Sequence, residues 1–177
     1  MQGVEEILKK ELEGKAFEVA VIPAKDIPFT DELIKACESN RCGRYKKSWM
    51  CPPAVGQVAE LEKKYKSYKY ALVFTTKGEL EDSFDIEGIE RARQRHLEIE
   101  RQAVEKVRGL GAEWLSAGSC DLCSECTYPD APCRFPDLAR PSPEACGIDV
   151  TALAKVCNMR YYNGENTVTF FSVIFFN

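Results

Sequence analysis

Nine cysteines are the residues of this sequence whose types and spacing point most directly to chemistry. Cys120, Cys123 and Cys126 follow a CxxCxxC pattern, which lets one loop present three thiolates around a compact multi-iron cluster. Cys133 comes after a spacer longer than that of the common four-cysteine run, within the sequence CRFP. The pattern predicts a [4Fe-4S] site in this segment and leaves its fourth ligand open.

A second group, Cys37, Cys42 and Cys51, ends almost 70 residues before Cys120 and contains only three thiols. Because a four-iron cluster takes four ligands, either Cys146, Cys133 or an external ligand would have to complete this group. Cys157, on a helix with apolar neighbours, is expected to be a small buried hydrophobic residue instead. Eight cysteines would serve two clusters, and the predicted metal ligands are Cys37, Cys42, Cys51, Cys120, Cys123, Cys126, Cys133 and Cys146.

Zinc is the main alternative to iron, because CxxC pairs also hold tetrahedral zinc, usually as two pairs separated by a longer loop. Three functions therefore stay open. The first is an electron-transfer or redox accessory protein with one or two [4Fe-4S] clusters and a redox partner protein. The second is an enzyme in which the group of Cys37, Cys42 and Cys51 leaves one iron open as a Lewis acid. The third is a zinc-stabilised binding module.

Other residues add less to this interpretation. Arg41, Arg44, Lys46 and Lys47 form a local basic patch that is suited to an acidic redox partner, although a solvated loop has the same composition. His96 is the single histidine and lies on the apolar stripe of a predicted helix, so we expect a core residue and not a ligand. The sequence lacks the glycine-rich phosphate loops GxGxxG and GxxxxGK.

The composition indicates a folded chain of one domain, residues 1–177, with 45% hydrophobic and 29% charged residues. Its 24 basic and 28 acidic residues give a net charge of −4, which disfavours binding to nucleic acid or to an anionic membrane. The opening residues read as a charged helix and not as a signal peptide, and no apolar run approaches the roughly 18 residues of a membrane span. We therefore expect a cytoplasmic protein, in which an odd number of cysteines favours metal binding over disulfides.

Hydrophobic periodicity predicts an α/β or α+β fold in which helices cover a sheet of about four strands. A turn is expected at Gly78, directly after the second strand. The predicted strands are 17–23, 70–76, 113–117 and 167–176, and the predicted helices are 4–13, 31–38, 58–65, 85–110 and 150–157. Two cysteine-rich loops, 37–56 and 118–147, are expected to meet at one end of the sheet as a metal-binding lobe.

Three segments resemble, in the same order, a family of uncharacterised predicted metal-binding proteins of anaerobic bacteria and archaea. They are CGRYKKSWMCPP, GSCDLCSECTYPDAPCRFP and ARPSPEACGIDV. The resemblance implies that Cys42, Cys51, Cys120, Cys123, Cys126 and Cys133 are the recurring cysteines. Cys37 sits at a wider spacing than the family pattern, and Cys146 is at a variable position. The resemblance implies metal binding and an anaerobic setting but no particular reaction.

Overall fold

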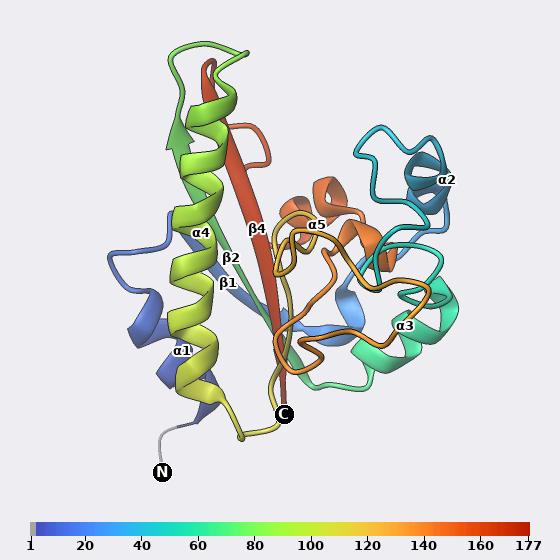
Figure 1. Cartoon of the computed structure of the whole chain (residues 1–177). Coiled ribbons are helices and arrows are strands. Elements are labelled where there is room, and N and C mark those ends of the chain that lie inside the picture. Colours follow the sequence, from blue (N-terminus) through green and yellow to red (C-terminus); the bar gives the residue numbers. More distant parts are fainter. Residues whose placement is uncertain (1–2) are drawn as a thin grey trace.

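The computed structural model describes residues 3–177 and contains an antiparallel four-stranded sheet with helices on both faces (Figure 1). The strands are β1 (Glu18–Pro23), β2 (Tyr70–Glu79), β3 (Glu113–Leu115) and β4 (Thr167–Phe176). Their order in the sheet is β1-β2-β4-β3, and every neighbouring pair is antiparallel. The fold is therefore α+β, which confirms the predicted class and the four predicted strands.

The two long central strands, β2 and β4, pair along their whole length, from Tyr70 opposite Phe176 to Glu79 opposite Thr167. The turn predicted at Gly78 is wrong, because β2 continues through this residue. A Cβ atom at Gly78 would collide with the Cβ atom of Ala92, so the glycine lets a helix lie close against the strand.

One face of the sheet is covered by α1 (Val4–Leu12) and the long helix α4 (Ile86–Val107). α4 begins where Asp85 accepts a hydrogen bond from the backbone N–H of Gly88 at 2.7 Å, an N-cap that satisfies one free donor of the first turn. The helix ends at Val107, three residues before the end predicted at Leu110. Gly109 follows with a positive φ of 81°. The even-numbered positions of β2 and β4, among them Leu72, face this layer.

The opposite face packs against α3 (Val58–Lys66), α5 (Val150–Val156) and two short 3₁₀ helices, η1 (Ala24–Asp26) and η2 (Glu144–Cys146). The short helix α2 (Glu32–Glu38) lies further out and has no fully buried residue. Tyr65 of α3 stacks on Phe175 of β4 with ring centroids 4.7 Å apart, which anchors this layer to the sheet.

The cysteine lobe, defined as residues 37–56 and 118–147, lies beside the face of the sheet that α3 and α5 cover (Figure 1). It was expected at one end of the sheet. Its position follows from Val55, Cys146 and Ile148, which pack into the apolar core on this face. Apart from η2 at Glu144–Cys146 and the last residues of α2, the lobe contains no helix or strand.

No helix among residues 3–177 combines the length and the apolar character that crossing a membrane requires.

Candidate metal centre

All four cysteines of the segment 120–133 line one small cavity of the lobe. They are Cys120, Cys123, Cys126 and Cys133. The long spacer before Cys133 loops out and returns, so the fourth thiol that the spacing left open reaches the same cavity as the other three. Within the described residues, the lining of this cavity includes no histidine, aspartate or glutamate. The donor set is therefore purely thiol, the chemistry that iron–sulfur clusters and structural zinc share.

The thiol of Cys126 has several hydrogen-bond donors around it. Burial alone would raise the pKa of its thiol, but hydrogen bonds outweigh burial and lower the pKa. The donors are the backbone N–H groups of Tyr128, Trp49 and Thr127 and the hydroxyl of Ser48. Donors converging on a sulfur stabilise its thiolate form, which is the form that binds metal.

The pKa of Cys120 is shifted in the opposite direction. Burial raises the pKa of its thiol, the backbone N–H of Leu122 opposes this, and the nearby Cys133 and Cys123 raise it further. The mutual effect shows that the sulfurs are close enough for their charges to repel. A bound cation would remove this repulsion, because a metal lowers the pKa of its thiol ligands.

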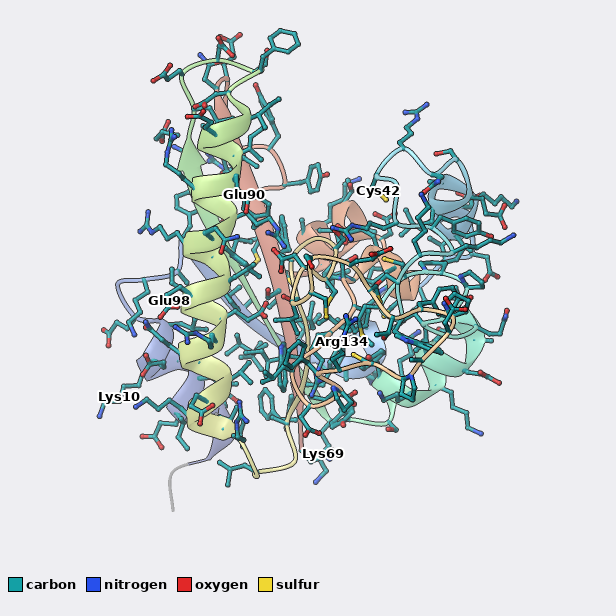
Figure 2. The ribbon with its side chains drawn as sticks, viewed as in Figure 1. Lys10, Cys42, Lys69, Glu90, Glu98 and Arg134 are labelled. Carbon is teal, nitrogen blue, oxygen red and sulfur yellow. The ribbon has the colours of Figure 1, made fainter. Side chains whose placement is uncertain are left out.

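The second group, Cys37, Cys42 and Cys51, is also brought together by the fold. Burial raises the pKa of Cys51, and the charges of Cys42 and Cys37 raise it further; burial and Cys42 likewise raise the pKa of Cys37. Figure 2 shows Cys42 on the loop next to α2, where its side chain is exposed. The three thiols thus lie near enough for their charges to act on one another, and the exposure of Cys42 leaves their group more open than the cavity of Cys120 to Cys133.

Ser48 and Trp49 join the two cysteine groups, although no sequence pattern singles out Ser48. The Ser48 side chain is 2% exposed, and its hydroxyl lies within hydrogen-bonding reach of both Cys51 and Cys126. The indole N–H of Trp49 donates to the backbone carbonyl of Ala131 at 3.0 Å. Its ring meets Tyr128 edge to face, with centroids 4.9 Å apart. The two loops therefore form one lobe through contacts that surround the sulfurs.

Cys146, which was also predicted to be a ligand, lies on η2, and this short helix packs against α2, which carries Cys37. Cys146 is fully buried in the apolar core beside the sheet, where the Tyr65 hydroxyl donates a hydrogen bond to its sulfur. Burial raises the pKa of Cys146 to about 12, which disfavours the thiolate. Cys157 is buried in the same core, as expected, and burial raises its pKa to about 11.

The space between the four thiols restricts what can bind without rearrangement. The cavity has a volume of about 20 Å³, close to the roughly 10–15 Å³ that one water molecule needs. No three Cys, His, Asp or Glu side chains among residues 3–177 already converge on a point where one ion would sit. The donor chemistry fits a metal, but both a single ion and a larger cluster require the thiol side chains to move. The loop has few regular hydrogen bonds to resist this movement.

His96 belongs to a buried polar network beneath α4 and not to the lobe. Its Nδ1 and Nε2 atoms lie 2.8 Å from the hydroxyls of Thr76 and Ser172. Ser172 in turn donates to Glu100, which also accepts from Ser116 at 2.8 Å. Burial lowers the pKa of His96 to about 3, so the ring is neutral. The expectation of a satisfied core histidine is confirmed, but the buried Glu100 beside it had no sequence signal.

A wider cavity of about 660 Å³ opens between the two loops and α3. Trp49, Tyr65 and Cys133 are among its lining residues, so one wall of the cavity is the outer side of the four-thiol group. The Lys64–Glu113 ion pair closes another side. A molecule in this cavity would lie against the lobe on the side away from α4.

Comparison with known proteins gives one match. The model of a family described as predicted metal-binding protein (DUF2284) matches residues 20–176, which is most of the chain. No curated protein and no solved structure matches the chain.

Proposed function

The chain belongs to this family of predicted metal-binding proteins, and from that premise we propose that it is a cytoplasmic iron–sulfur protein. The observation that carries the proposal is the cavity lined by Cys120, Cys123, Cys126 and Cys133. Four thiols from one loop, with backbone N–H groups directed at a sulfur, form the ligand environment that [4Fe-4S] clusters require. The hydrogen bonds to Cys126 support this assignment because such donors tune the potential of a cluster.

A second cluster is proposed for the group of Cys37, Cys42 and Cys51, with the fourth position filled from outside this group. The proposal rests on the proximity of these three thiols and on their link to the first group through Ser48. The buried position of Cys146 in the core argues against its serving as the fourth ligand. The ligand set of the proposal is thus seven of the eight cysteines predicted.

The proposed role is electron transfer to a partner protein or a redox accessory role. A cluster would supply one-electron chemistry, and the chain would supply its insulation and docking surface. Arg41, Lys46 and Lys47 are exposed next to Cys42, and Arg44 lines the four-thiol cavity. Positive charge at this position favours an acidic partner protein and speeds its approach.

Cysteine variants of anaerobically purified protein test the ligand assignment. We expect Cys126→Ser to lose the iron and the visible absorption of the first site, and Cys51→Ser to lose only those of the second. Cys157→Ser is the matched control, because Cys157 is equally a cysteine but lies in the core away from both groups. Full iron retention in Cys126→Ser, or equal loss in Cys157→Ser, would contradict the assignment.

Zinc in the four-thiol cavity is the second candidate, and the small volume of about 20 Å³ favours it. Four thiolates satisfy the tetrahedral coordination of one structural zinc ion, which would fix the loops of a binding module. A colourless protein that retains zinc and contains no sulfide after anaerobic purification would establish this alternative.

An enzyme with an open iron is the third candidate. The group of Cys37, Cys42 and Cys51, of which Cys42 is exposed, favours it, because three thiolates leave one iron of a four-iron cluster free to bind substrate. A spectral change of the loaded protein on addition of a small iron ligand such as cyanide, absent in Cys51→Ser, would support this role.

A further inference from the structure

A second cavity lies on the other side of the 118–122 segment, against α4. Its volume is about 200 Å³. Cys120 and Leu122 line both this cavity and the four-thiol cavity, whereas Asp121 lines this cavity alone. Leu97, Trp114 and Leu138 contribute to its mainly apolar lining. The volume is below the roughly 300 Å³ at the lower end of common ligand sites, so only a small molecule fits.

Most of the positive charges around this cavity are already paired. Arg93 donates to Asp121 at 2.7 Å, and Arg101 and Arg108 form ion pairs with glutamates of their own segment. Arg140 is different. It forms no ion pair with any side chain among residues 3–177, and its guanidinium lies over the ring of Trp114, 4.0 Å from the centroid.

The hydrogen bonds of Arg140 leave one edge of its guanidinium free. Its Nη1 donates to the backbone carbonyls of Pro136 and Ala139 at 3.2 and 2.6 Å. Its Nε is buried and has no acceptor within the described part of the chain, and no hydrogen bond of its Nη2 is found there either. A buried guanidinium N–H without an acceptor is costly, and the Nε–Nη2 edge is one that a carboxylate matches with two parallel hydrogen bonds.

Glu100 forms part of the cavity wall but does not occupy this edge by a direct hydrogen bond. Its carboxyl is 5% exposed and accepts from the hydroxyls of Ser116 and Ser172 and from the backbone N–H of Ala117. Burial raises the pKa of Glu100 to about 7, and the positive charge of Arg140 opposes this rise. Arg140 and Glu100 therefore influence each other through space, but no hydrogen bond or ion pair joins them among residues 3–177.

We propose that this cavity binds a small organic carboxylate, with the apolar body against Leu97, Trp114 and Leu138 and the carboxylate on the free edge of Arg140. Arg140 would reorient slightly to expose its Nε–Nη2 edge. The bound molecule would touch the segment that carries Cys120, next to the proposed metal site. The side chains proposed to contact the carboxylate are not metal ligands, so this binding site is independent of which metal the lobe holds.

Calorimetric titration of the metal-loaded protein with phenylacetate tests this proposal, with the neutral isostere phenylacetamide as the matched ligand. We expect phenylacetate to bind at least about tenfold more tightly than the amide, because the amide cannot form the charge-assisted pair. Arg140→Gln should remove this preference. Arg91→Gln should keep it, because Arg91 is an exposed, ion-paired residue of α4 that does not line the cavity.

A second variant guards against a folding effect of the Arg140 substitution. Leu97→Trp keeps every charge but fills the cavity, so it should abolish binding of both ligands while leaving the iron content and the circular dichroism unchanged. Three results would overturn the proposal: no phenylacetate binding at millimolar concentration, equal affinity for acid and amide, or undiminished binding in Leu97→Trp. Inorganic phosphate that competes as well as phenylacetate would show a simple anion site and would also overturn it. Unchanged iron content alongside lost binding separates this site from the proposed metal centre.

Discussion

The two faces of the sheet are stabilised in different ways. Beneath α1 and α4, aliphatic and aromatic side chains enclose a hydrogen-bonded network around His96 and Glu100. On the other face the core is continuous with the cysteine lobe, most of which has no helix or strand. The first region is held together by burial and hydrogen bonding. For the second region, the proposed function implies that a bound metal adds cross-links between the loops.

Metal removal should produce the largest effect and would separate the two regions. We expect chelation to raise amide exchange in residues 118–142 by at least about 100-fold, because the loop then loses its main cross-link. β2, β4 and α4 should keep their protection. Hydrogen exchange followed by mass spectrometry measures both regions in one sample, and uniform loss of protection over the whole chain would contradict the division.

The pH dependence of unfolding should report on the α4 face alone. Burial lowers the pKa of His96 from 6.5 to about 3. Between these two pH values the His96 imidazole is therefore protonated in the unfolded chain and neutral in the folded protein. The contribution of neutral His96 to the free energy of unfolding is complete above pH 6.5. It falls by roughly a few kcal/mol as the pH drops toward 3.

Glu100 has the opposite dependence, since burial raises its pKa from 4.5 to about 7. Its contribution is complete below pH 4.5 and is lost as the pH rises through 7. Glu100→Gln should therefore steepen the gain in stability between pH 4.5 and 6.5, because only the His96 effect remains. Urea unfolding at several pH values measures this, and an unchanged slope would mean that Glu100 is not protonated in the fold.

Cys146→Ala should affect stability and leave metal binding intact. The residue is fully buried beside Tyr65, so removing its sulfur costs about 1–2 kcal/mol and lowers the melting temperature by roughly 2–6 °C. Iron content should equal that of the unmodified protein. Loss of half the iron would instead make Cys146 a ligand, which would move part of the metal site into the core.

Ser48→Ala should give the smallest change. The Ser48 hydroxyl is the hydrogen-bond donor to the sulfurs of Cys51 and Cys126. Its loss should therefore remove about 1 kcal/mol of stabilisation from the reduced, more negative form of the proposed cluster. For a one-electron couple this corresponds to a potential lower by about 40 mV. Ser124→Ala, at an exposed position of the 118–147 loop, is the control and should leave the potential unchanged.

Local patterns were enough to predict much of this structure. Apolar residues at helical spacing identified α4, and β-branched and aromatic residues identified β4. The extension of β2 past Gly78 was missed because it depends on pairing with β4, which is distant in sequence. Packing against Ala92, and not a turn, explains the glycine.

The residues of the candidate site also fall into two sets: those that a local motif identifies and those that only the fold brings together. CxxCxxC is a local motif, so Cys120, Cys123 and Cys126 could be grouped from sequence, and the fold adds Cys133 to them. Cys146 could not be separated from the ligands by spacing, because its burial arises from α3 and the sheet. Ser48 and Arg140 are single polar residues without a periodic signal, and only the packing of two loops shows what they contact.

The central claim is that the four thiols of the 120–133 segment hold an iron–sulfur cluster. Iron, zinc and acid-labile sulfide per chain, counted in Cys51→Ser purified under strict anaerobiosis, test it most directly, because this variant should retain only the first site. We expect about four iron and four sulfide per chain and no zinc. Zinc without sulfide, or no metal at all, would contradict it.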